Sequence, residues 1–116
     1  MNVETTNGMS IDSTVINNYF KSLVNHFFKI LPMRENNEPS LCLYMKTLQS
    51  ELIGCKDLVL AIQNDASYMT LLAILQYLID NIDDPECTVM VVRRNVFRAI
   101  SICNKLKLQY ADGEVF

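Results

Sequence analysis

Four stretches of the chain repeat apolar residues every three or four positions, the spacing that lines up one face of an α-helix. The first runs over residues 16–30, and the second runs over 41–62 without a change of phase. The third covers about 68–82, and the fourth covers 88–110. These patterns predict an all-α fold, a compact bundle of about four helices.

Local signals indicate where these helices begin and end. Asp12 or Ser13 is expected to cap the first helix, because a side-chain oxygen there accepts a hydrogen bond from an unpaired N–H group. Asp65 or Ser67 is expected to cap the third helix in the same way. Pro32 predicts the end of the first helix, since proline disfavours helical backbone in the residue before it.

The second helix is expected to be long. Its apolar repeat passes through Gly54, so we predict one helix over about 39–62 rather than two. Gly54 weakens such a helix by about 1 kcal/mol relative to alanine. We expect it either to mark a kink or to let a neighbouring helix approach closely.

The third and fourth helices have unusual compositions. The third is apolar nearly all round, which is typical of a helix buried on most sides. We therefore expect it to lie centrally in the bundle or at the interface of an oligomer. The fourth opens with the β-branched run 88–92, which also fits a strand, but an isolated strand would have no partner in this chain.

The 116 residues are enough for one domain. We expect the helical bundle over 12–110, between flexible tails over 1–11 and 111–116. No apolar stretch reaches the ~20 residues that a bilayer requires. The N-terminus lacks the basic and apolar regions of a secretory signal, so a cytoplasmic location is expected.

The cysteines do not suggest a metal site. No Cys-x-x-Cys pair occurs, and His26 is the only histidine. In a reducing compartment, widely spaced cysteines are expected to stay free thiols. The four that we expect to be free are Cys42, Cys55, Cys87 and Cys103.

No pattern of catalytic residues is evident. His26 is a single candidate base, and the three glycines are isolated from one another, so they form no phosphate-binding loop. The acidic segment 80–86 lacks the alternating positions and central glycine of a calcium loop. We therefore expect no cofactor, no metal site and no enzymatic activity.

Charge is distributed unevenly along the chain. Residues 88–110 carry five basic and no acidic side chains, whereas residues 1–87 carry five basic and eleven acidic ones. Arg94, Arg98 and Lys105 are spaced so that they share one face of the last helix. That face is a solvated surface, a site for an acidic protein partner, or a site for nucleic acid. The net charge of −3 and the expected lack of exposed aromatic residues between the basic ones disfavour nucleic acid.

Three segments resemble known proteins. Residues 28–35 (FKILPMRE), 38–41 (EPSL) and 51–55 (ELIGC) resemble small helical proteins of Firmicutes and of their phages or mobile elements, a group without a known activity. The resemblance covers most of residues 15–106. It implies a bacterial or phage accessory protein and transfers no functional residue.

Together these features predict a non-enzymatic helical protein-interaction module, such as an adaptor or an inhibitor. Its partner is expected to be another protein or a second copy in a homo-oligomer. The alternative is a nucleic-acid-binding accessory protein that uses the basic face of the last helix. Aromatic and arginine side chains dominate interface energies. The predicted partner-binding residues are Arg93, Arg94, Arg98, Lys105, Tyr68 and Tyr77.

Overall fold

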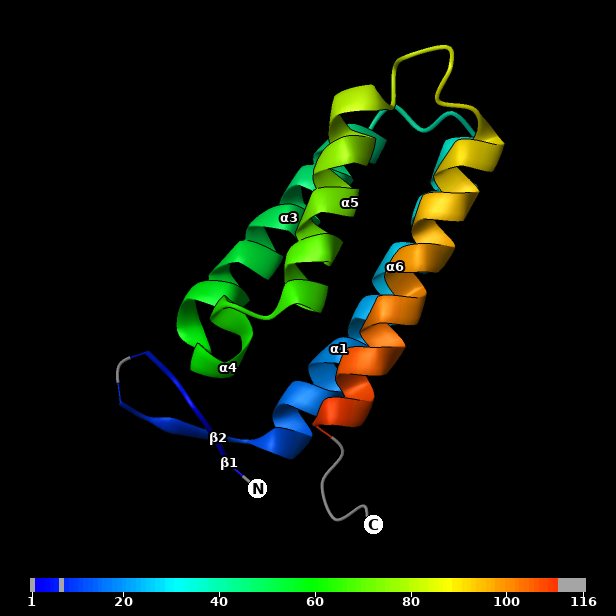
Figure 1. The fold of residues 1–116 in the computed structure, drawn as a ribbon. Coiled ribbons are helices and arrows are strands. Elements are labelled where there is room, and N and C mark those ends of the chain that lie inside the picture. Colours follow the sequence, from blue (N-terminus) through cyan, green and yellow to red (C-terminus); the bar gives the residue numbers. More distant parts are fainter. Residues whose placement is uncertain (1, 7, 111–116) are drawn as a thin grey trace.

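Two pairs of antiparallel helices make up most of the molecule (Figure 1). The computed structural model describes residues 2–6 and 8–110. The pairs are α1 (Ser13–Phe28) with α6 (Val89–Gln109), and α3 (Leu41–Leu58) with α5 (Ala66–Asn81). Because α5 also contacts α6, the two pairs form one body. The prediction of a compact, mainly helical fold is confirmed.

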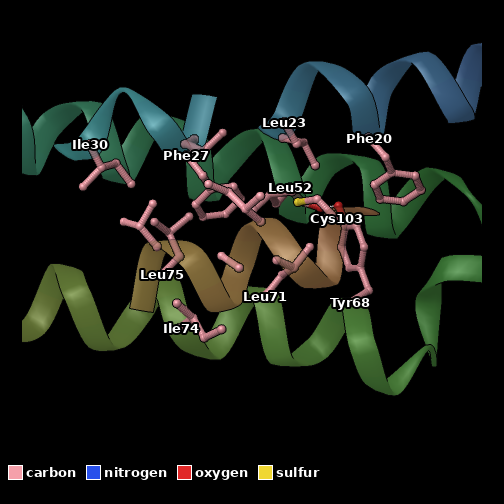
Figure 2. Close-up of a cluster of buried hydrophobic side chains, with 14 of the residues drawn as sticks. Phe20, Leu23, Phe27, Ile30, Leu52, Tyr68, Leu71, Ile74, Leu75 and Cys103 are labelled. Carbon is pink, nitrogen blue, oxygen red and sulfur yellow. Dashed lines mark hydrogen bonds between the residues drawn. The ribbon is translucent and has the colours of Figure 1, made fainter. Parts of the chain in front are cut away.

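The core lies between the two pairs. Each long helix turns its apolar stripe inward, and burial of that surface stabilises the fold by about 25 cal/mol per Å². None of the described helices is both long enough and apolar enough to span a membrane. Figure 2 shows core side chains from all four long helices, among them Phe20, Leu23, Phe27, Leu52, Tyr68, Leu71, Leu75 and Cys103.

The helix caps follow the local sequence signals. The Asp12 carboxylate accepts a hydrogen bond from the N–H of Thr14 at 2.9 Å, and Asp65 accepts one from the N–H of Tyr68 at 3.0 Å. The Thr88 hydroxyl caps α6 in the same manner. The β-branched opening of this segment is therefore helical, as predicted.

Pro32 does not end the first helix. That helix ends earlier, at Phe28, and Pro32 lies in the first turn of the short helix α2 (Ile30–Glu35). The first turn of a helix tolerates proline, because the backbone N–H groups of that turn have no partner within the helix and proline merely lacks one of them. The prediction that Pro32 is a stop signal was wrong.

The predicted single helix over 39–62 is broken. Val59 has extended backbone angles, φ −106° and ψ 115°, and separates α3 from the short helix α4 (Leu60–Gln63). Gly54, where we expected a kink or a close approach, lies within α3 and is exposed. Apart from the adjacent residues and backbone of α3 itself, no atom lies within 4 Å of the position that a Cβ would occupy on it.

A short hairpin contacts this break. The strands β1 (Asn2–Glu4) and β2 (Ser10–Asp12) pair antiparallel, and Thr5 forms a β-bridge with Val59. The N–H of Thr6 donates a hydrogen bond to the carbonyl of Leu58 at 2.7 Å. We expected no regular structure over 1–11, so the described part of this segment differs from that prediction. The other predicted tail, 111–116, lies outside the described residues.

Candidate functional site

An open groove of about 520 Å³ runs between α5 and α6. Ile74, which is almost wholly buried, forms its floor. Ala73 has a short side chain, which leaves space between the two helices at the middle of the groove. The lining residues are Met69, Thr70, Ala73, Ile74 and Tyr77 from α5, and Asn95 and Arg98 from α6.

Two of the polar side chains in the groove are already hydrogen-bonded within their own helices. The Thr70 hydroxyl donates to the carbonyl of Ala66 at 2.9 Å, and the Asn95 amide donates to the carbonyl of Val91 at 2.9 Å. What remains for a ligand is the apolar surface, the phenol of Tyr77 and the guanidinium of Arg98. Tyr77 is 44% exposed.

The basic face of α6 borders this groove. Arg94, Arg98, Ser101 and Lys105 are all exposed, so the predicted single face is present in the structure. Arg98 lines the groove itself. Within residues 2–6 and 8–110, none of these three basic side chains forms an ion pair. Their positive charge is therefore available to a ligand.

Arg93 lies on the other flank of α6. Its Nη2 atom is 3.3 Å from Oε1 of Glu35 at the end of α2, and both side chains are about half exposed. Arg93 therefore belongs to a contact between α6 and α2, and it does not reach the groove.

Tyr68 is not a surface anchor. Its side chain is fully buried, and its hydroxyl donates a hydrogen bond to the carbonyl of Leu52 at 2.7 Å. Burial raises the pKa of the Tyr68 phenol well above its usual value of 10.0. Our prediction that Tyr68 contacts a partner was wrong, because this side chain belongs to the core.

Sequence reasoning missed the apolar wall of the groove. Met69, Ala73 and Tyr77 are each four residues apart, and this spacing places them in one row along a helix. We did not identify this row from the sequence because most residues of α5 are apolar. The apolar residues that face the groove therefore could not be distinguished from those that face the core.

The groove offers binding surface and no recognisable catalytic pair. Its lining residues include no histidine, cysteine or carboxylate. His26 lies elsewhere, half-buried on α1, and its Nδ1 atom has no hydrogen-bond partner in the part of the chain that the structure describes. In the described ranges, no three His, Cys, Asp or Glu residues cluster where they could hold a metal ion.

The four cysteines are free thiols in the structure, as the sequence predicted. Cys87 and Cys103 are buried, whereas Cys42 and Cys55 are half-buried. Burial raises the pKa of the Cys103 thiol to about 12, so at neutral pH this thiol keeps its proton and behaves as a small apolar group.

Comparison with known proteins identifies no family. No protein-family model, no curated protein and no solved structure matches the chain significantly. The interpretation of the groove and of the basic face therefore depends on their own geometry and chemistry.

Proposed function

We propose that this chain is a non-enzymatic protein-interaction module whose α5–α6 groove binds an acidic amphipathic helix of a partner protein. The observation that carries the proposal is the position of Arg98. This arginine has no ion pair among the described residues and lies at the edge of an open groove with an apolar floor.

The dimensions of the groove fit a short helical ligand. The α5 wall runs from Met69 to Tyr77, which is about 12 Å, or roughly two turns, at 1.5 Å per residue. Helices that bind in grooves insert apolar side chains spaced by one or two turns. Two such side chains fit between Met69 and Tyr77, with Ala73 leaving room for the bulkier one.

Charge complementarity defines the polar edge of the ligand. Arg98 lines the groove on its α6 side, and the exposed Arg94 and Lys105 continue the same face of α6 before and after it. Acidic residues on the flank of a bound helix would lie against this face, which speeds association and fixes the orientation of the ligand. A basic ligand would be repelled.

The resemblance of residues 28–35, 38–41 and 51–55 to small helical proteins of Firmicutes and their mobile elements implies an accessory protein without a known activity, and we propose that this chain acts as an adaptor or inhibitor in the cytoplasm of such a host. In that setting the groove would capture a helix of a host or phage protein. A second copy of this chain is the other occupant to test, because the acidic segment 80–86 could supply the complementary charge in a homo-oligomer.

The experiment is a selection followed by a binding measurement. A displayed library of helical peptides is selected on the whole chain, and the enriched peptides are labelled for fluorescence anisotropy. We expect peptides with an apolar stripe and an acidic flank, whose binding is lost in Tyr77→Ala and in Arg98→Glu. Lys46→Glu, a charge reversal on an exposed residue of α3, is the matched control and should bind normally.

Three results would contradict the proposal. Enriched peptides without acidic residues would remove the role of the basic face. Binding that survives both groove variants would place the site elsewhere. A concentration-dependent dimer in light scattering that Tyr77→Ala dissociates would assign the groove to a second copy.

A further inference from the structure

The α1–α6 pair is free of carboxylates. Within Ser13–Phe28 and Val89–Gln109 the chain has six basic side chains and no aspartate or glutamate. All thirteen acidic residues lie outside these two helices. Because α1 and α6 lie side by side (Figure 1), the six basic side chains belong to one helix pair, and among the described residues Glu35 of α2 is the carboxylate that forms an ion pair with it, at Arg93.

Two phenylalanine rings meet at the seam between α1 and α6. The rings of Phe28 and Phe97 pack edge to face, with centroids 5.9 Å apart and an interplanar angle of 83°. Phe28 is 41% exposed and Phe97 is 45% exposed. Neither ring belongs to the buried core, so both offer aromatic surface to the solvent.

A second contact fixes how the two helices align. The Asn17 side-chain amide donates a hydrogen bond to the carbonyl of Lys107 at 2.7 Å, about three turns along the seam from the rings. Lys21 lies seven residues before Phe28 and therefore on the same side of α1. Lys21 is exposed and Lys107 is half-buried, so the seam has two rings toward one end and one basic residue from each helix toward the other.

We propose that this outer face of the α1–α6 pair binds single-stranded nucleic acid. Lys21 and Lys107 would hold the phosphates, and a base would stack on the exposed ring of Phe97. Proteins that bind single strands combine a basic track with aromatic side chains in this way. We expected no exposed aromatic residue among the basic ones, but Phe97 is exposed, and the fold brings Phe28 and Phe97 together across 69 positions of the chain.

A single strand fits this face better than a duplex. The face is built from two helices packed side by side along their length. Stacking on a phenylalanine requires a base that is not already stacked in a duplex. The phosphate contacts add affinity that does not depend on sequence.

This face is separate from the α5–α6 groove. Phe97 and Arg98 are neighbours in sequence, so they point about 100° apart around the helix. Arg98 lines the groove beside α5, whereas Phe97 contacts α1. Variants of one surface can therefore serve as controls for the other.

The test uses a labelled single-stranded oligonucleotide, the duplex of the same sequence, heparin and anionic phospholipid vesicles as four separate probes. We expect the single strand to bind most tightly and its affinity to fall steeply with salt. Phe97→Ala and Lys21→Glu should each weaken binding about tenfold. Tyr77→Ala and Lys46→Glu should leave it unchanged.

A fluorescence measurement distinguishes stacking of a base on residue 97 from a general attraction of the basic side chains to any negatively charged ligand. The chain contains no tryptophan, so Phe97→Trp introduces a single indole at the site. We expect this variant to retain binding and its emission to be quenched by the single strand but not by heparin. Equal affinity for heparin and the single strand, or binding that Phe97→Ala does not affect, would overturn the proposal. Preferential binding to vesicles would also overturn it and would assign the face to a membrane surface.

Discussion

Tyr68 and Leu52 connect α5 to α3 by a hydrogen bond inside the core. The phenolic oxygen of Tyr68 lies 2.7 Å from the carbonyl oxygen of Leu52, and both side chains are fully buried. A tyrosine in an apolar interior requires such a partner, because an unpaired hydroxyl there costs about 1–3 kcal/mol. This bond fixes how far α5 can slide along α3.

Replacing Tyr68 with phenylalanine tests the strength of that connection. Tyr68→Phe removes the hydroxyl and keeps the ring, so we expect the free energy of unfolding to fall by about 1 kcal/mol. Tyr77→Phe makes the same chemical change on an exposed residue of the same helix and should alter stability by less than about 0.5 kcal/mol. Urea unfolding followed by circular dichroism measures both. Equal effects would mean that the buried bond contributes nothing.

Gly54→Ala is expected to stabilise the protein. Gly54 is exposed within α3, and a Cβ there would meet no atom within 4 Å beyond the adjacent residues and backbone of its own helix. Alanine in a helix interior is favoured over glycine by about 1 kcal/mol, and thermal unfolding should show a rise in the melting temperature. Gly8→Ala is the contrasting variant and should destabilise, because Gly8 has φ +85°. A lower melting temperature for Gly54→Ala would contradict the helical conformation at this position.

Alkaline pH is expected to destabilise the fold. Burial raises the pKa of Cys103 from 9.0 to about 12, and burial also raises the pKa of Tyr68 above 10.0. Above pH 9 the unfolded chain loses the Cys103 proton while the folded chain keeps it. The folded state then binds more protons, so the free energy of unfolding falls as pH rises toward 12.

Urea unfolding at a series of alkaline pH values measures this fall. Cys103→Ala removes one of the titrating groups, so its stability should depend less steeply on pH than that of the wild type. A pH dependence that is the same in both proteins would show that the Cys103 thiol ionises equally in the folded and unfolded states.

The N-terminal hairpin is expected to protect the break between α3 and α4. A chain that begins at residue 11 keeps the Asp12 cap of α1 but loses the hydrogen bond from Thr6 to Leu58. We expect faster hydrogen exchange at Leu60–Gln63 and little change at the centre of α6. Unchanged exchange around α4 would show that the hairpin does not support this turn.

The helices were predictable because their signals are local. Each apolar stripe consists of residues that are three or four positions apart in the sequence. The caps at Asp12 and Asp65 likewise accept hydrogen bonds from N–H groups only two or three positions away. The break at Val59 was not predictable, because its partners Thr5 and Thr6 are more than fifty residues distant. The stripe through 41–62 carries no sign of that contact.

The candidate site was only partly predictable for a similar reason. Tyr68 and Tyr77 are nine residues apart, which places them on opposite faces of α5, so they could not both be surface anchors. This geometry was readable from the sequence, and it leaves Tyr77 as the exposed one. Tyr77 and Arg98 face each other across the groove because of the way α5 packs against α6. No local sequence pattern predicts that packing.

The helix pair whose own residues include no carboxylate separates basic from acidic side chains in a molecule whose net charge is only −3. A charged surface orients the approaching protein by long-range electrostatic attraction. A negatively charged surface would therefore meet the α1–α6 side first, and a positively charged surface would meet the side that carries the acidic residues. At neutral pH and low ionic strength, the same chain should therefore be retarded on both cation- and anion-exchange resins. The cation exchanger would bind the α1–α6 side, and the anion exchanger would bind the side with the acidic residues.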